Sequence, residues 1–141
     1  MTLRLILPFL ILLAFTQIHA QSILGKWKTI DDETGQPKAI VEIYQKGDKY
    51  FGKIVELFRK PGEDPNPKCT ECEDYRKDQP IKGMVIVSDM VLDEDEYVDG
   101  QILDPKKGSV YDCKMWLENG NLMVRGYKFF FYRTQTWYRV K

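Results

Sequence analysis

Beyond residue 20, apolar and polar residues alternate with a period of two, which is typical of half-buried β-strands. The clearest case is the segment 109–118, where every second residue from Tyr111 to Leu117 is apolar and the residues between them are mostly charged. No segment keeps a period of 3.6 long enough to predict a helix. The pattern predicts eight short strands, at residues 24–30, 38–45, 49–58, 81–90, 97–104, 109–118, 121–128 and 133–140.

Turn sequences separate these segments. The stretch 105–108 reads PKKG and the stretch 119–121 reads NGN, both of which favour tight turns between antiparallel strands. Eight antiparallel strands favour a sandwich or a closed barrel, and a barrel leaves no strand edge unpaired. We therefore predict an all-β, calycin-like antiparallel barrel of eight strands, filled by side chains or by one small ligand. Four glycines are expected where its strands bend: Gly52, Gly83, Gly100 and Gly126.

The first 20 residues have the layout of a secretory signal peptide. Arg4 precedes an unbroken apolar run at 5–15, and a more polar stretch ends at Ala20. The run is shorter than the roughly 20 residues that a membrane-spanning helix needs, so an uncleaved anchor is the less favoured alternative. We predict cleavage before Gln21 and a single domain over 21–141, periplasmic or secreted, with no transmembrane segment in the mature chain.

Charge and histidine content exclude several function classes. The chain has 21 basic and 21 acidic side chains, and loss of Arg4 with the leader leaves one more acid than base. This balance gives no electrostatic reason to expect nucleic acid or an anionic membrane as a partner. The only histidine, His19, lies in the leader. A mature chain without histidine has no Ser–His–Asp or Cys–His mechanism and no imidazole for zinc.

Two cysteines three residues apart, Cys69 and Cys72, lie in a polar stretch between predicted strands. An exported protein favours a local disulfide here, although a metal site, a redox pair or free thiols stay open. Only Cys113 could add a third sulfur ligand, and it lies on the apolar face of its segment. A thioredoxin-like pair would start a helix, which this loop does not. We predict a disulfide, with no metal and no cofactor.

Two further stretches are candidate surfaces. The acidic stretch 89–99 lacks the spacing of a calcium-binding loop and reads as a solvated turn. The stretch 127–133, YKFFFYR, places three consecutive phenylalanines in a predicted hairpin tip. These rings could line a barrel mouth, touch lipid or bind a protein partner, or they could simply fill the core.

Residues at the two ends of the domain resemble the lipocalin and fatty-acid-binding barrels. Gly25 and Trp27 form a G-x-W pair on the first predicted strand, and Arg139 lies near the end of the last one. The resemblance implies that Trp27 closes one end of the barrel and that Arg139 packs across its ring in a cation–π contact.

The chain also resembles DUF2147, a family of exported bacterial proteins named as a domain of unknown function. Beside the G-x-W pair, the matching segments are GKIVEL (52–57), PNP (65–67), IKGMVI (81–86), GQILDPKKGSVYDCKMWL (100–117), LMVRGY (122–127) and RTQTWYRV (133–140). Chains that look like this usually carry a small apolar–glycine step after RGY, where this one has Lys128 and three phenylalanines. Any contact that the family makes at this hairpin is therefore in doubt here.

The barrel prediction leads to a functional one by analogy of fold. We expect non-catalytic binding of a small apolar or amphipathic, lipid-like ligand. The alternatives are a solid barrel that acts as a protein–protein interaction or envelope-structural module, and an enzyme. Asp104, Tyr111, Arg125 and Arg133 could be assembled into a catalytic group, but turn chemistry and cross-strand pairing explain them better. The residues expected to border the ligand are Val41, Ile43, Tyr111, Met115, Val124, Phe129, Phe130 and Phe131.

Overall fold

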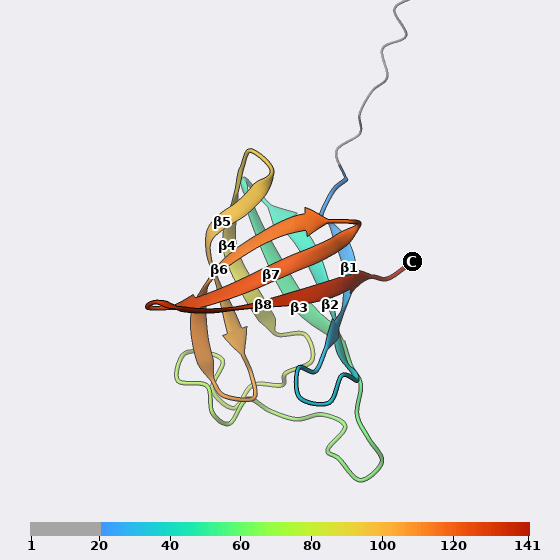
Figure 1. The fold of residues 1–141 in the computed structure, drawn as a ribbon. Helices are drawn as coiled ribbons and strands as arrows, with labels where there is room; N and C mark the ends of the chain where they lie inside the picture. The colour runs from blue at the N-terminus through green and yellow to red at the C-terminus, as the bar shows by residue number, and fades with distance from the viewer. Residues whose placement is uncertain (1–20) are drawn as a thin grey trace, which may run out of the picture.

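Eight antiparallel strands close into a barrel in the computed structural model, which describes residues 21–141 (Figure 1). Each strand pairs with the next one in the chain. The barrel closes where the first strand pairs with the last, with Trp27 opposite Arg139 and Lys28 opposite Tyr138. The predicted leader, residues 1–20, lies outside the described residues. The strands are β1 (Gly25–Ile30), β2 (Pro37–Lys46), β3 (Lys49–Leu57), β4 (Val85–Asp93), β5 (Glu96–Asp104), β6 (Ser109–Glu118), β7 (Asn121–Lys128) and β8 (Phe131–Arg139).

The predicted all-β closed barrel is confirmed, and each predicted segment corresponds to one strand. The two largest boundary differences are both in β4, and the other strand ends agree within two residues. β4 begins at Val85 rather than at residue 81, because Gly83 lies in a turn with φ of 88° instead of in a strand. β4 also continues to Asp93, so the acidic stretch 89–99 forms the hairpin between β4 and β5 rather than a separate bend.

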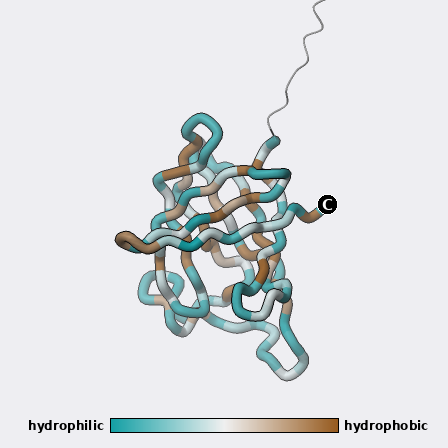
Figure 2. Tube along the Cα trace, in the orientation of Figure 1, coloured by the Kyte–Doolittle hydropathy of each residue, from teal (hydrophilic) through white to brown (hydrophobic). Residues whose placement is uncertain are grey.

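The inward faces of the strands build the core, as the alternation predicted. Hydrophobic residues follow the strands, whereas the connections at the lower end of the barrel are mainly hydrophilic (Figure 2). Two glycines make room where inner faces crowd. A Cβ at Gly100 would lie 2.2 Å from Met90 Sδ, and one at Gly52 would lie 2.9 Å from Ile43 Cδ1. Both sit where the strand pairing shifts register, which is where barrel strands bend most.

The connection between β3 and β4, residues 58–84, is long and has no strand of its own apart from a bridge between Lys68 and Pro80. Arg76 anchors it. This side chain is 8% exposed, pairs with Asp74 at 2.6 Å and donates a hydrogen bond to the Val85 carbonyl. The guanidinium of Arg76 also holds the pKa of Asp74 below its ordinary value. The loop is thus fixed to the start of β4 rather than free.

Over residues 21–141, the structure contains no helix that is both long and apolar enough to cross a membrane.

Candidate ligand cavity

One end of the barrel is closed by a stacked pair of side chains. Trp27 is fully buried, and the Arg139 guanidinium lies over its ring at 4.2 Å from the centroid. The Trp27 indole donates to the Ile23 carbonyl at 2.8 Å, and Arg139 donates to the carbonyls of Leu24 and Ser22. These bonds hold the segment before β1 across the barrel end.

The core toward this closed end is built from large side chains. The fully buried ones include Ile43, Met90, Met115 and Leu122. Tyr50 and Tyr97 add an edge-to-face aromatic pair with ring centroids 4.8 Å apart. None of these six residues is among those that line the cavity described next.

The opposite end holds a cavity of about 800 Å³ that opens to solvent. Its volume falls within the roughly 300–1,000 Å³ that is usual for sites of small organic ligands. The deep wall is apolar and comes from five strands, β2, β3, β4, β5 and β7, and Gly126 leaves the wall on β7 without a side chain. The apolar residues of this wall include Ala39, Val41, Ile54, Ile86, Ile102, Leu103 and Val124.

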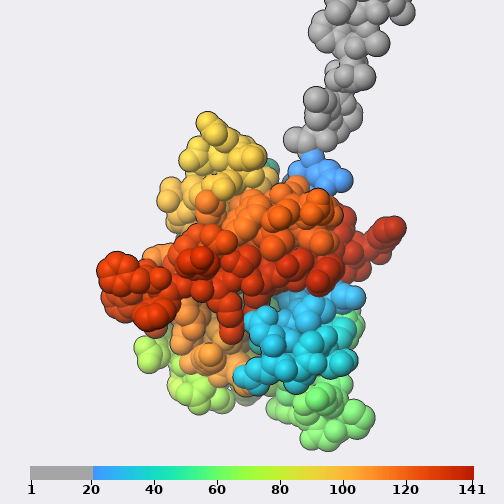
Figure 3. Space-filling view, viewed as in Figure 1, coloured from blue at the N-terminus to red at the C-terminus, as the bar shows by residue number. Residues whose placement is uncertain are grey.

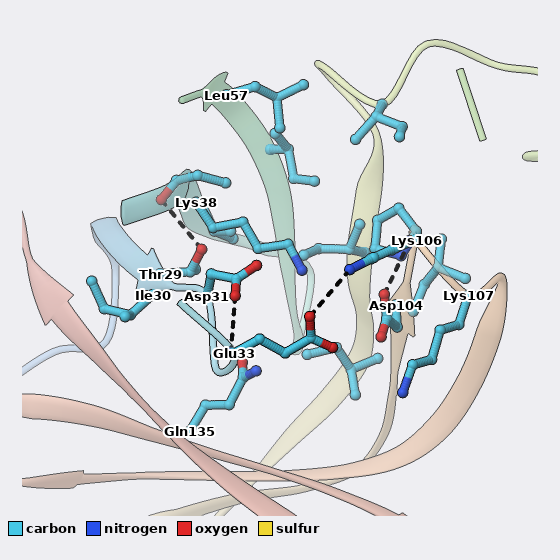
Figure 4. A pocket seen from close by; sticks show the side chains of 18 of the residues that line it. Thr29, Ile30, Asp31, Glu33, Lys38, Leu57, Asp104, Lys106, Lys107 and Gln135 are labelled. Carbon is cyan, nitrogen blue, oxygen red and sulfur yellow. Dashed lines mark hydrogen bonds and ion pairs between the residues drawn. The ribbon is translucent and has the colours of Figure 1, made fainter. Parts of the chain in front are cut away.

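Charged side chains form the rim (Figure 4). Glu33, in the loop between β1 and β2, pairs with Lys106 of the β5–β6 turn at 3.8 Å. Asp31 accepts hydrogen bonds from the backbone N–H groups of Glu33 and Thr34, each at 2.9 Å. The hydrogen bond from the Thr34 N–H contributes most to holding the pKa of Asp31 below its ordinary value. The cavity thus combines an apolar interior with a charged entrance.

A polar network joins the rim to β8. Gln135 donates to Asp32 at 2.7 Å and accepts a hydrogen bond from the Trp137 indole at 3.1 Å. Asp32 also pairs with Arg133 at 3.1 Å. The network fixes the β1–β2 loop against the last strand. Asp32 and Gln135 were not among the predicted site residues, because a contact across 103 positions of sequence leaves no local pattern.

The residues that were expected to border a ligand divide into three groups. Val41, Tyr111, Val124 and Phe131 line the cavity. Ile43 and Met115 are buried in the core and do not line the cavity, although Ile43 is two positions beyond Val41 and Met115 pairs with Val124.

Phe129 and Phe130 do not lie where we expected them. They form the tip of the β7–β8 hairpin, 90% and 98% exposed, and the neighbouring Phe131 is 79% exposed. The tip projects well beyond the barrel wall (Figures 1 and 3). The hairpin turns within two residues, with Phe129 at φ of 57°, so both rings are carried outward instead of over the cavity.

Cys69 and Cys72 form a disulfide, with a Cα–Cα distance of 5.4 Å, and both residues are buried. Cys113 remains a free thiol inside the barrel, and burial raises its pKa to about 12. Such a thiol stays protonated at neutral pH and is therefore neither a ready nucleophile nor a ready metal ligand. In the part of the chain that the structure describes, no three Cys, Asp or Glu residues are grouped to hold a metal ion.

The four residues considered for a catalytic group do not all meet. Asp104, Tyr111 and Arg133 line the mouth of the cavity, but Arg125 lies on the outer surface of β7. There its guanidinium stacks 4.9 Å from the Trp116 ring and 4.5 Å from the Tyr132 ring, and it donates to Thr134. Arg125 thus acts as a cross-strand contact of the outer face.

Comparison with known proteins identifies a family and a similar fold. Residues 25–139 match the model of a family described as "Uncharacterized protein conserved in bacteria (DUF2147)". No curated protein matches the chain significantly. Among solved structures, the chain is similar to HP1028 from the human pathogen Helicobacter pylori, which is described as belonging to the lipocalin family. The TM-score is 0.73 at 17% identity, over 86% of this chain and 85% of that one, so the likeness establishes the fold alone.

Proposed function

The chain belongs to the DUF2147 family, and from the barrel geometry we propose that it binds a small apolar or amphipathic ligand, such as a lipid, without chemical conversion. The observation that carries the proposal is the cavity of about 800 Å³ at one end of a barrel whose other end is closed. A solid barrel, the alternative from sequence, is less well supported because this half is not filled by side chains.

The proposal includes export of the protein. A leader over residues 1–20, cleaved before Gln21, would deliver a single domain of residues 21–141 to the periplasm or the exterior. The Cys69–Cys72 disulfide supports an oxidising compartment. The intact mass of protein recovered from a periplasmic extract tests the cleavage, and a mass that includes residues 1–20 would contradict it.

Replacing Gly126 with leucine should block the cavity without unfolding the barrel. A Cβ at this position would lie 3.4 Å from Tyr111 Cβ and 3.7 Å from Ile102 Cγ2, which are ordinary contacts, so the added side chain extends into the open space. We expect binding of N-phenyl-1-naphthylamine, an uncharged apolar dye, to weaken by about tenfold or more. Fluorescence titration gives the dissociation constant, and thermal unfolding verifies the fold.

The matched control is Met123→Leu, which places a leucine on the same strand. Met123 contacts the Thr136 hydroxyl through its sulfur, at a pair of positions on the outer face of β7 and β8. This variant should bind the dye as the wild type does. If wild-type protein does not bind the dye, or if Gly126→Leu binds it equally well, the cavity is not a ligand site.

A second candidate function is contact with a protein partner through the stretch 127–133. The observation that favours it is the tip itself, where three consecutive phenylalanines are 79–98% exposed. Exposed rings grouped in this way usually mark an interaction site. Such a partner would offer an apolar pocket, since aromatic anchors bind most strongly when they are fully desolvated.

A photo-crosslinking residue at position 130 tests this second function in living cells. We expect one protease-sensitive adduct of defined mass, and none when the same group replaces Tyr75, an aromatic residue that is 79% exposed in the β3–β4 loop. Adducts with phospholipid alone would assign the tip to a membrane surface instead. Equal labelling at both positions would show that the tip has no specific partner.

A further inference from the structure

Basic side chains gather around the mouth of the cavity, although the chain as a whole has 21 basic and 21 acidic side chains. Among the residues that line the cavity, eight are lysine or arginine and four are aspartate or glutamate. The excess is local to the entrance, because the deep wall is apolar. A local excess of one sign raises the concentration of ligands of the opposite sign at that place.

Ion pairs neutralise part of this charge but leave a positive remainder. Lys106 pairs with Glu33, Arg59 with Glu63 and Arg133 with Asp32. Of the carboxylates at the rim, Asp31 and Asp104 are then left, and both already accept backbone N–H bonds. Within residues 21–141, five cavity-lining lysines form no ion pair: Lys38, Lys60, Lys68, Lys107 and Lys128.

These five lysines, the lysine ring, surround the entrance instead of lying on one side of it. They come from the start of β2, the β3–β4 loop, the β5–β6 turn and the end of β7. In Figure 4, Lys38 of β2 and Lys106 of the β5–β6 turn point toward the same space, and Lys107 of that turn lies at the rim and points away from them. Apolar residues continue inward from the ring, as on β2, where Lys38 is followed by Ala39 and Val41. The site therefore changes from cationic at the surface to apolar inside.

We propose that the ligand is an anionic amphiphile, with its apolar tail in the barrel and its carboxylate or phosphate head at the lysine ring. This inference rests on the proposed function, because it assumes that the cavity binds a ligand. The head stays at the rim and keeps part of its hydration, so no charge is buried in the barrel. Lysine stems can cover the outer part of the tail while their ammonium groups stay in water.

Four amphiphiles with the same twelve-carbon tail test the proposal: dodecanoate, dodecyl phosphate, dodecanol and dodecyltrimethylammonium. Each displaces the uncharged dye from protein produced from the full chain in an exporting host, below its micelle concentration. Of dodecanoate and dodecyl phosphate, we expect the one with the higher affinity to bind about tenfold more tightly than dodecanol. We expect the cation to bind most weakly. The ratio of the two anions distinguishes a carboxylate from a phosphate head. Added salt should reduce the preference for the anions and leave dodecanol unchanged.

Lys38→Gln/Lys107→Gln removes two charges from the lysine ring and should reduce the preference for the anions severalfold, with dodecanol unaffected. The matched control, Lys26→Gln/Lys46→Gln, removes two exposed lysines near the closed end and should leave the preference intact. If dodecanol binds as tightly as the anions, or if both double variants act alike, the inference is overturned while the apolar cavity stands. If neither the dye nor any of the four binds, the proposed function fails and this inference fails with it.

Discussion

Replacing Trp27 with alanine will lower the free energy of unfolding by about 3–5 kcal/mol. The side chain is fully buried, carries the Arg139 guanidinium at 4.2 Å and donates a hydrogen bond to the Ile23 carbonyl. Its loss removes packing, leaves a cavity beneath a cation and frees the segment that crosses the closed end. These contributions act on the pairing of β1 with β8, where the first and last strands of the barrel meet. Urea unfolding followed by far-ultraviolet circular dichroism measures the change without relying on tryptophan fluorescence.

Trp116→Ala is the matched control for this substitution. Trp116 is also a tryptophan in a cation–π contact, with Arg125 at 4.9 Å, but it lies on the outer face of β6 and is partly exposed. We expect the free energy of unfolding to fall by about 1 kcal/mol, since exposed cation–π contacts contribute little to stability. Equal losses for the two variants would show that Trp27 does not have a special role in closing the barrel.

The strands and the closed end could be predicted from sequence because both leave local signals. Alternation in a segment such as 109–118 fixes which side chains face inward, and turn sequences such as PKKG fix where strands end. Gly25 and Trp27 lie two positions apart, so a short motif is sufficient to identify them. The disulfide was favoured for a similar reason, since only two residues separate its cysteines.

The hairpin tip could not be predicted because it breaks the usual turn chemistry. Two-residue hairpin turns favour Asn or Gly where φ is positive, but here Phe129 adopts φ of 57°. The sequence YKFFFYR therefore gave no sign of which residues turn. A shift of one position exchanges inward and outward rings, and this is why Phe131 borders the cavity while Phe129 and Phe130 do not.

The charged mouth of the cavity could not be predicted either, for a different reason. Lys38, Lys68 and Lys107 each occur in an unremarkable polar stretch, and only the closure of the barrel brings them to one opening. Net charge was a misleading guide, because it averages the surface and here is close to zero. The distribution of charge, and not its total, thus carries the information about a ligand, which requires the fold to be known first.

Gly108→Ala should be the most damaging single change at the open end. Gly108 has φ of 69°, and an added Cβ would lie 1.9 Å from the Glu71 carbonyl oxygen and 2.9 Å from the Cys72 nitrogen. Both neighbours are backbone atoms of the loop that the disulfide fixes, so neither can rotate away. The loop must then separate from the β5–β6 turn. We expect the free energy of unfolding to fall by about 3 kcal/mol or more, because the strained backbone conformation and the clash both contribute.

Gly120→Ala separates these two contributions. Gly120 has a similar φ of 80°, but an added Cβ would meet nothing within 4 Å, so this variant carries the backbone cost of about 1 kcal/mol alone. Urea unfolding gives the difference between the variants, and limited trypsin digestion at Lys68 and Lys77 reports on the loop. Equal stability and equal digestion would show that the loop does not depend on the turn.

The same pair of variants connects the loop to function. Pro67, Lys68 and Thr70 belong to this loop and line the mouth of the cavity. If Gly108→Ala displaces the loop, it should also weaken binding of the uncharged dye, and Gly120→Ala should not. Dye binding that survives in a Gly108→Ala protein with a trypsin-sensitive loop would mean that the strands alone form the ligand site. The disulfide would then serve the stability of the loop rather than the entrance of the cavity.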